Sequence, residues 1–365
     1  MGSTDRQFIT RCFELALRGK GWASPNPMVG CVVVRNGRVV GEGYHRRHGG
    51  AHAEIEALKR AGRDASGAVL YVNLEPCSHH GKKPPCVDAI IRAGVKRVVT
   101  SCVDPNRLAS GKGIRALRRA GVSVHVGILG KEAEALNEKF FYFMKKKVPF
   151  VGLKITQTLD GRSADSGGLS RGITSAAARA EEHSIRSEYD AILVGAGTVR
   201  RNNPKLTVRF VRGRNPVRVI LDPQLSTDPE SEIYRTRSAE TLLLTSAAAM
   251  TKRRAFVRTL TRAGVRILGL DEEKSFDLRI VLRILSALGV SSVLVEGGPS
   301  TASLFLESHL VQRVHWFIAP KLLGGGKSSF TRSQPLHLSR SILLRNCSVS
   351  SIGTDILVEG KPWYR

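Results

Sequence analysis

Two cysteines, Cys77 and Cys86, delimit the stretch PCSHHGKKPPC, which also contains two histidines and two lysines. Two thiols at the ends of a basic loop can form a disulfide, a closed structural metal site or an open catalytic metal site. A third potential ligand, His52, lies upstream in the motif His-Ala-Glu, next to the carboxylate of Glu54. These residue types are those of a metal-dependent hydrolytic site, provided that the fold brings them together.

The N-terminus argues against the disulfide. It has no signal-peptide core and is typical of an amphipathic helix, with Phe8, Ile9, Leu15 and Ala16 on one side. We therefore expect a cytoplasmic protein, and in a reducing compartment a patterned cysteine pair more often binds metal or catalyses. The other cysteines lie in apolar runs and are predicted to be small core residues: Cys12, Cys31, Cys102 and Cys347.

A histidine and two cysteines are borderline-soft ligands that suit a tetrahedral Zn²⁺ ion. With three protein ligands the fourth position stays open for water, which is the mark of a catalytic site. Glu54 can reach that position from the first turn of a helix and act as a proton shuttle. The pattern is similar to the zinc deaminase signature, although there the cysteines are spaced C-x-x-C and here eight residues separate them.

The elements that must position these residues can be predicted from hydrophobic periodicity. Residues 53–61 have helical apolar spacing, and residues 68–77 form a buried strand that runs into the cysteine loop. A second helix begins next to Pro84-Pro85, where proline is favourable. Asn36-Gly37 joins two β-type runs as a hairpin. Strands that alternate with helices in this way predict an α/β sheet with helices on its faces.

The length of 365 residues favours two domains, and 42% hydrophobic with 24% charged residues is ordinary for a soluble globular protein. Residues 131–145 are predicted to form one more helix, and the sequence KKKVP marks the boundary, which predicts domains at 1–147 and 148–365. The second domain again alternates strands and helices. Its strands are predicted in FVGLKIT, YDAILVGAGTV, PVRVILD, ETLLLTS and VSSVLVEGGPS, and its helices near 175–187, 251–262, 276–288 and 299–309.

The charge is strongly basic, with 57 Lys and Arg against 31 Asp and Glu, a net +26. The excess is spread over both halves and does not form a tail. It is compatible with nucleic-acid binding, with phosphorylated small substrates, or with an arginine-rich solvated surface. Aromatic residues are only 6% and do not interleave with basic ones, which disfavours a stacking platform for nucleic acid.

Several ordered motifs carry a resemblance that covers nearly the whole chain. They are SPNPMVGCVVV, GYHRRHGGAHAEIEAL, NLEPCSHHGKKPPC and DPNRLASGKG, followed by KITQTLDGRSA, DAILVGAGTVRRNNPKLTVR, VEGGPST and KLLGGG. Together they resemble the bifunctional deaminase/reductase of riboflavin biosynthesis. The long loop between the cysteines distinguishes that family from deaminases of tRNA adenosine and of cytidine.

The resemblance implies a cytidine-deaminase-like domain followed by a dihydrofolate-reductase-like α/β domain. The first would hydrolyse the 2-amino group of 2,5-diamino-6-(5-phosphoribosylamino)pyrimidin-4-one, and the second would reduce the ribosyl group of the product to ribityl with NADPH. The implied partner is thus a phosphorylated pyrimidine rather than nucleic acid or a membrane, and self-association is left open.

The resemblance also implies roles for individual residues. In the deaminase half, the resemblance implies that His52, Cys77 and Cys86 bind zinc and that Glu54 transfers protons. The implied substrate contacts are Asn26, His45 and Lys82. In the reductase half, the cofactor residues are Thr156, Gly172, Thr198, Asn202, Thr245, Ser246, Gly298, Pro299, Ser300, Thr301, Ala302, Ser303 and Leu304. The substrate residues there are Ser170, Arg186, Leu206, Arg209 and Glu296. A guanidinium binds phosphate in a bidentate manner, which suits the two arginines.

Two positions depart from the family pattern, and both fall in the reductase half. Asn202 stands where the family usually has aspartate, and an amide cannot accept a proton as a carboxylate does. Gly172 stands where the family usually has tryptophan, which removes a large packing surface. Three functions therefore compete: the bifunctional enzyme, a deaminase whose second domain only binds nucleotide or phosphosugar, and a nucleic-acid deaminase.

Overall fold

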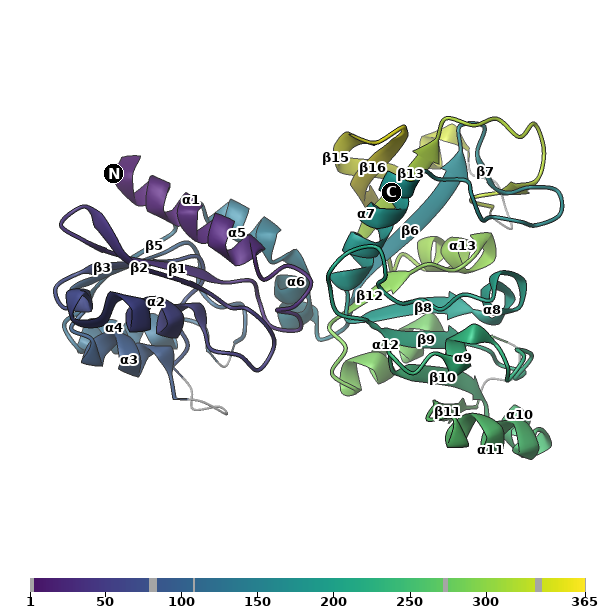
Figure 1. The fold of residues 1–365 in the computed structure, drawn as a ribbon, viewed down its shortest axis with the longest axis horizontal. Coiled ribbons are helices and arrows are strands. Elements are labelled where there is room, and N and C mark those ends of the chain that lie inside the picture. The colour runs from purple at the N-terminus through teal and green to yellow at the C-terminus, as the bar shows by residue number, and fades with distance from the viewer. Residues whose placement is uncertain (1–2, 79–83, 108, 272–274, 332–336, 365) are drawn as a thin grey trace. The chain divides into compact units, whose positions relative to one another are not determined.

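The computed structural model describes residues 3–78, 84–107, 109–271, 275–331 and 337–364. Within it the chain forms two compact units, Met1–Lys147 and Val148–Arg365. Each unit is built around its own sheet, and each is described separately here (Figure 1).

The first unit has a five-stranded sheet in the order β2-β1-β3-β4-β5. The hairpin β1–β2 is antiparallel and turns at Asn36 and Gly37, whose φ angles of 50° and 75° lie in the left-handed region that this turn requires. The strands β3, β4 and β5 run parallel. The bounds are β1 Gly30–Arg35, β2 Arg38–Tyr44, β3 Val69–Val72, β4 Arg97–Thr100 and β5 Ser123–Val126.

Helices cover both faces of this sheet (Figure 1). On one face α1 packs its apolar side, including Ile9 and Leu15, against Val32 and Val99. The opposite face buries Leu58, Val87 and Leu117 of three further helices. The helices are α1 Ser3–Leu17, α2 Ala53–Ala61, α3 Cys86–Arg92, α4 Lys112–Arg119, α5 Gly130–Leu136 and α6 Glu138–Lys146, with a short 3-10 turn at Gly62–Ala65.

One helix expected over residues 131–145 is instead two, α5 and α6, separated at Asn137. The side chain of Asn137 accepts the backbone N–H of Met28 at 2.8 Å and donates to the carbonyl of Met28 at 2.9 Å. Two hydrogen bonds to one distant residue, together with a non-helical φ of −112°, interrupt the helix there. Apolar periodicity carries no signal for such a tertiary contact.

The second unit has a nine-stranded sheet in the order β11-β10-β9-β8-β12-β6-β13-β16-β15. Neighbouring strands are parallel from β11 to β13, whereas β16 pairs antiparallel with both β13 and β15. The strands are β6 Phe150–Thr158, β8 Ala191–Gly195, β9 Val217–Leu221, β10 Thr241–Ser246, β11 Arg266–Leu270, β12 Ser292–Val295, β13 Arg313–Ala319, β15 Leu343–Ile352 and β16 Asp355–Trp363. A separate two-stranded sheet pairs β7 Arg162–Ala164 with β14 Lys327–Ser328.

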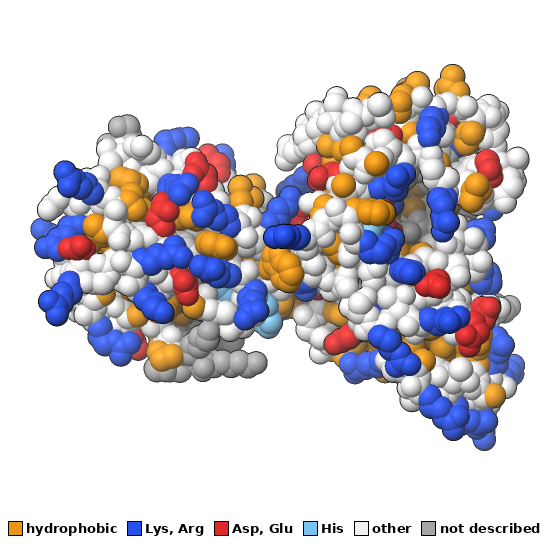
Figure 2. Space-filling model, viewed as in Figure 1, with side chains coloured by type: hydrophobic (Ala, Val, Ile, Leu, Met, Phe, Trp, Pro, Cys, Tyr) orange, Lys and Arg blue, Asp and Glu red, His pale blue; other side chains and the backbone are white. Residues whose placement is uncertain are grey.

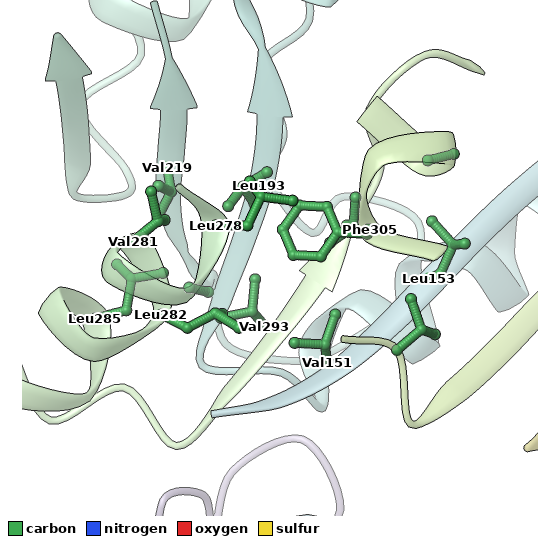
Figure 3. Packing of buried hydrophobic residues seen from close by; sticks show 14 of the residues in the cluster. Val151, Leu153, Leu193, Val219, Leu278, Val281, Leu282, Leu285, Val293 and Phe305 are labelled. Carbon is green, nitrogen blue, oxygen red and sulfur yellow. The ribbon is translucent and has the colours of Figure 1, made fainter. Parts of the chain in front are cut away.

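The core of this unit lies between the parallel strands and the helices that connect them. Figure 3 shows Val151, Leu193 and Val293 on the strands in contact with Leu282 of α12 and Phe305 of α13. All five side chains are at most 3% exposed. The helices are α7 Ala176–Ser187, α8 Ala196–Asn202, α9 Glu232–Arg235, α10 Ala247–Lys252, α11 Arg254–Arg262, α12 Leu278–Ala287 and α13 Pro299–Glu307, with a 3-10 turn at Leu338–Arg340.

The predicted α/β fold class is confirmed for both units. The antiparallel pair β15–β16 was not among the predicted strands, because nearly every residue of β15 is exposed and its sequence lacks an apolar alternation. On the face shown in Figure 2, Lys and Arg side chains are scattered over both units. No helix in the described ranges is long and apolar enough to cross a membrane.

Candidate active sites

The first site lies where three elements of the N-terminal unit meet. His52 directly precedes α2, Cys77 follows β3, and Cys86 is the first residue of α3. The imidazole Nδ1 of His52 lies 3.2 Å from the Sγ of Cys86 and 3.5 Å from the Sγ of Cys77. Residues separated by up to 34 positions are thus brought together as one cluster, and among the described residues it is the cluster with a metal-ligand arrangement.

Close packing of α2 on the sheet places His52 in this cluster. A Cβ atom at Gly43 of β2 would lie only 2.4 Å from the carbonyl oxygen of Ala53, and one at Gly41 would lie 2.3 Å from that of Ala57. Only glycine allows this approach, because any side chain would push the helix away from the strand.

The donor set fits a zinc ion. The three ligand atoms all lie within 4.8 Å of one another. Tetrahedral zinc with bonds of about 2.1–2.3 Å holds its ligand atoms roughly 3.5 Å apart, which agrees with the spacing of this cluster. One nitrogen and two sulfurs are ligands that zinc prefers, and the three leave one tetrahedral position open.

The two thiols differ in acidity. A hydrogen bond from the Cys86 thiol holds the pKa of Cys77 well below its ordinary value, with a further contribution from His52, although partial burial opposes it. The same hydrogen bond, together with burial, raises the pKa of Cys86. The backbone N–H of Cys86 also donates to the Cys77 sulfur at 3.3 Å. Cys77 is therefore held as a thiolate, which is the form that binds metals.

Glu54 lies in the first turn of α2 and is only 4% exposed. Burial raises the pKa of its carboxyl group above the ordinary value. It lines a cavity of about 240 Å³ together with His52 and Cys77. A buried carboxyl group beside the cluster is placed to accept and return a proton.

Two of the three expected substrate contacts line the same cavity. The amide of Asn26 lies 3.1 Å from Nε2 of His45, whose Nδ1 lies 2.9 Å from the carbonyl oxygen of Ala51. Because a carbonyl only accepts, Nδ1 carries a proton, and Nε2 faces the amide of Asn26. The third expected contact, Lys82, lies outside the described residues.

Residue-by-residue reasoning missed other residues that line this cavity. Asp104 and Asn106 follow β4, and Phe140 and Met144 come from α6. The motif that contains Asp104 and Asn106 is visible in the sequence, but nothing in its spacing says that it returns to the zinc ligands.

A second cavity, of about 150 Å³, lies in the C-terminal unit at the carboxyl ends of parallel strands β6, β8 and β12. This is the usual place for a ligand in an open α/β sheet. The predicted residues that line it are Thr156, Ser170, Thr198, Asn202, Glu296, Gly298, Pro299 and Ala302. The hydroxyl of Thr198 accepts the N–H of Gly298 at 3.1 Å and so ties α8 to the turn before α13.

The remaining predicted residues of this half are not among those that line the cavity: Gly172, Arg186, Leu206, Arg209, Thr245, Ser246, Ser300, Thr301, Ser303 and Leu304. Ser246 is buried as the N-cap of α10, and Thr245 is buried beside the carbonyl of Pro223. Gly172 has a φ of 88°, and a Cβ there would meet no atom within 4 Å.

Arg186 has a partner within the protein. Its guanidinium donates to both carboxylate oxygens of Glu296 at 2.9 Å and to the carbonyl of Thr207 at 2.8 Å, and the residue is 6% exposed. Arg209 is exposed and donates to the hydroxyl of Thr207 at 2.9 Å. The fold therefore uses Arg186 to hold a buried carboxylate.

Lys154 and Glu182, both half-buried, complete this network and were missed from the sequence. The ammonium of Lys154 lies 3.5 Å from Glu182 and 3.5 Å from Glu296. Burial alone would raise the pKa of Glu296, but Arg186 and Lys154 outweigh it and lower that pKa to about 2. Two carboxylates and two cations thus neutralise one another beside the cavity.

Comparisons with known proteins agree with this two-part arrangement. The family described as "Cytidine and deoxycytidylate deaminase zinc-binding region" matches residues 2–102, and that described as "RibD C-terminal domain" matches residues 149–358. The chain is thus a two-part enzyme with a zinc-binding deaminase part and a reductase part that uses a nicotinamide cofactor.

Relatives that match nearly the full length of the chain identify its family more specifically. The riboflavin biosynthesis protein RibD of Aquifex aeolicus is 43% identical over 97% of each chain, and that of Escherichia coli is 40% identical over 88% of this chain and 89% of its own. Among solved structures, Acinetobacter baumannii RibD has a TM-score of 0.90 at 33% identity, covering 99% of each chain. A deaminase/reductase from Thermotoga maritima has a TM-score of 0.85 at 38% identity, also over 99% of each.

The chain belongs to the RibD family of bifunctional deaminase/reductases of riboflavin biosynthesis. The expected family and the bifunctional activity are confirmed, and the deaminase-only and nucleic-acid alternatives are not favoured.

Proposed function

We propose that residues 1–147 deaminate 2,5-diamino-6-(5-phosphoribosylamino)pyrimidin-4-one and that residues 148–365 reduce the ribosyl group of the product with NADPH, in the cytoplasm. The observation that carries the proposal is the convergence of His52, Cys77 and Cys86 with buried Glu54 at one cavity. The relative from Thermotoga maritima is described as a deaminase and reductase of such phosphoribosylaminopyrimidines.

For the deaminase we assign His52, Cys77 and Cys86 as the ligands of zinc. Zinc bound there would lower the pKa of a water molecule and so supply the nucleophile. Glu54 accepts the proton that this water loses and delivers it to the departing 2-amino group. A carbon–oxygen bond forms at C2, the carbon–nitrogen bond breaks, and ammonia leaves. The burial that raises the pKa of Glu54 suits it to this exchange.

Substrate recognition in this half is assigned to Asn26 and His45. Their mutual hydrogen bond fixes the amide of Asn26 at the cavity, where its oxygen and second N–H can read a pyrimidine edge. Lys82 is proposed as a phosphate partner from the family pattern, since an ammonium is a compact charge for that purpose.

For the reductase we assign the cofactor to the cavity at Thr156, Thr198, Asn202 and Gly298. NADPH bound there would supply a hydride to C1 of the ribose. Lys154 can donate the proton that the opened ring oxygen requires, since it carries a proton: Glu182 and Glu296 outweigh burial and raise its pKa above the ordinary value. Two exposed cations that line the cavity, Arg201 and Lys327, suit a cofactor with the additional phosphate.

The proposal is tested with the purified protein in two assays. The diaminopyrimidinone phosphate should release one ammonia per molecule without any nicotinamide, and the isolated aminouracil phosphate should then oxidise NADPH in a one-to-one ratio. Ammonia release from a tRNA or from cytidine, but not from the pyrimidinone phosphate, would contradict the proposal. A reductase that prefers NADH would overturn the cofactor assignment alone.

A further inference from the structure

Glu75 lies two residues before the zinc ligand Cys77, and its carboxylate makes an unusual set of contacts. Oε2 accepts the backbone N–H groups of Asp104 at 3.0 Å and Gly111 at 2.8 Å. Oε1 accepts those of Gly113 at 2.9 Å and Ile114 at 3.2 Å. The residue is 5% exposed. One buried side chain thereby holds both ends of the segment between β4 and α4.

The charge of Glu75 is balanced by these backbone donors. In the described part of the chain no Lys or Arg forms a salt bridge with it, so four N–H groups, two of them in the first turn of α4, provide the stabilisation. A carboxylate that accepts several backbone N–H groups makes strong, charge-assisted hydrogen bonds. The carboxylate of Glu75 therefore anchors the backbone of the segment between β4 and α4.

The anchored segment forms part of the wall of the deaminase cavity. Asp104 and Asn106 line this cavity together with His52, Glu54 and Cys77, and so does Glu75 itself. The backbone N–H of Asn106 donates to the Asp104 side chain at 2.8 Å, which ties the two residues to each other. By fixing the backbone of Asp104, Glu75 fixes both side chains relative to the zinc ligands.

We propose that Glu75 is a positioning residue of the deaminase, one that sets the distance between the metal ligands and the wall carrying Asp104 and Asn106. The inference rests on the proposed deaminase function. Because Glu75 acts on the shape of the cavity and not on the zinc ligands or Glu54, its loss should weaken substrate binding and leave the metal in place.

The sharpest test is Glu75→Gln. Each carboxylate oxygen accepts two N–H groups, so in either orientation the amide of glutamine directs its NH₂ at two backbone donors. Unsatisfied donors of this kind cost enough to predict a rise of about 10- to 100-fold in KM for the diaminopyrimidinone phosphate. The kcat should stay within about threefold, and zinc should remain at one per chain.

Glu42→Gln is the matched control. Glu42 accepts two hydrogen bonds from Arg11 in the same unit, outside the residues that line the cavity, so its loss should leave KM unchanged. Gly113→Ala provides a second route to the same effect, because a Cβ there would lie 2.1 Å from the carbonyl oxygen of Pro76 and displace the segment. If Glu75→Gln does not fold, Gly113→Ala tests the inference instead, by the same rise in KM with zinc retained.

An unchanged KM in the folded variants would overturn the inference, as would loss of zinc or an equal rise in Glu42→Gln. Wild-type protein that releases no ammonia from the pyrimidinone phosphate would instead defeat the proposed function. The two failures are therefore distinguished by the wild-type assay.

Discussion

The two cavities balance their charges in different ways. The deaminase cavity is lined by three carboxyl-bearing residues, Glu54, Glu75 and Asp104, together with His52 and Cys77, and no lysine or arginine is among the described residues that line it. The reductase cavity is bordered by Lys154, Glu182, Arg186 and Glu296, whose charges compensate one another within the protein. The first site therefore has a lining that suits an added cation, whereas in the second the four-residue network is neutral by itself and Arg201 and Lys327 also line the cavity.

Because of this difference, we expect substitutions in the two cavities to have different effects on activity and stability. Loss of a ligand in the deaminase cluster should abolish chemistry while the fold survives, since each ligand is one of several groups around an ion. Loss of a member of the reductase network should destabilise the unit, because a buried charge would remain without its partner. The predictions below test this contrast, beginning with the largest effect.

Cys86→Ser should abolish zinc binding and lower ammonia release by more than about 10³-fold, because the nucleophile depends on the metal. NADPH oxidation with the aminouracil phosphate should remain within about twofold. Metal analysis and the two assays on one sample measure all three quantities. Cys347 was predicted to be a core residue, but it is exposed on β15, so Cys347→Ser offers a control that should change none of them. Equal loss of both activities would show that the substitution acts on folding.

Glu54→Gln should retain zinc but lower the deaminase kcat by about 10²–10⁴-fold, the usual contribution of a positioned proton carrier. Glu56, on the same helix but not among the residues that line the cavity, provides the control Glu56→Gln, with unchanged activity. Steady-state ammonia release measures both. Full activity in Glu54→Gln would remove this residue from the mechanism.

Glu296→Gln should lower the free energy of unfolding of the reductase unit by about 3–5 kcal/mol, because Arg186 and Lys154 lose a buried carboxylate. The exposed pair of Arg235 and Glu230 offers a contrast, and Glu230→Gln should cost at most about 1 kcal/mol. Urea unfolding measures both. Similar small values for the two variants would show that the network is not a stabilising unit.

The stabilisation from Glu296 should disappear in acid. Its pKa is about 2 in the folded protein against an ordinary 4.5, so the carboxylate contributes stability above about pH 4.5 and loses it as the pH falls toward 2. The difference in unfolding free energy between wild type and Glu296→Gln should therefore shrink on going from about pH 5 to about pH 3. A difference that stays constant or grows would contradict the assigned pairing.

How much the sequence predicts also differs between the two cavities. His52, Cys77 and Cys86 have distinctive chemistry at the ends of predictable elements, so their meeting could be anticipated from local patterns. Arg186 was expected to bind phosphate, since nothing local shows that Glu296, 110 residues away, takes its guanidinium. Lys154 and Glu182 were missed for the same reason, because a charged residue within a strand or helix gives no sign of a distant partner.

Glu75 illustrates the same limit inside the better predicted half. Its motif is conspicuous, but its four hydrogen bonds reach a segment 29 to 39 residues later in the chain. Asn137 likewise breaks a predicted helix by binding Met28, 109 residues away. Hydrophobic periodicity predicts helices and strands, and residue type predicts metal ligands. Contacts between polar side chains and distant backbone groups become visible only in the folded structure.

The central claim is that His52, Cys77 and Cys86 hold one zinc ion that the deaminase half requires and the reductase half does not. The most direct measurement is metal content with both activities on the same protein before and after chelation. We predict one zinc per chain, loss of ammonia release on its removal with recovery on adding zinc, and unchanged NADPH oxidation throughout. Ammonia release that persists after complete zinc removal would contradict the account.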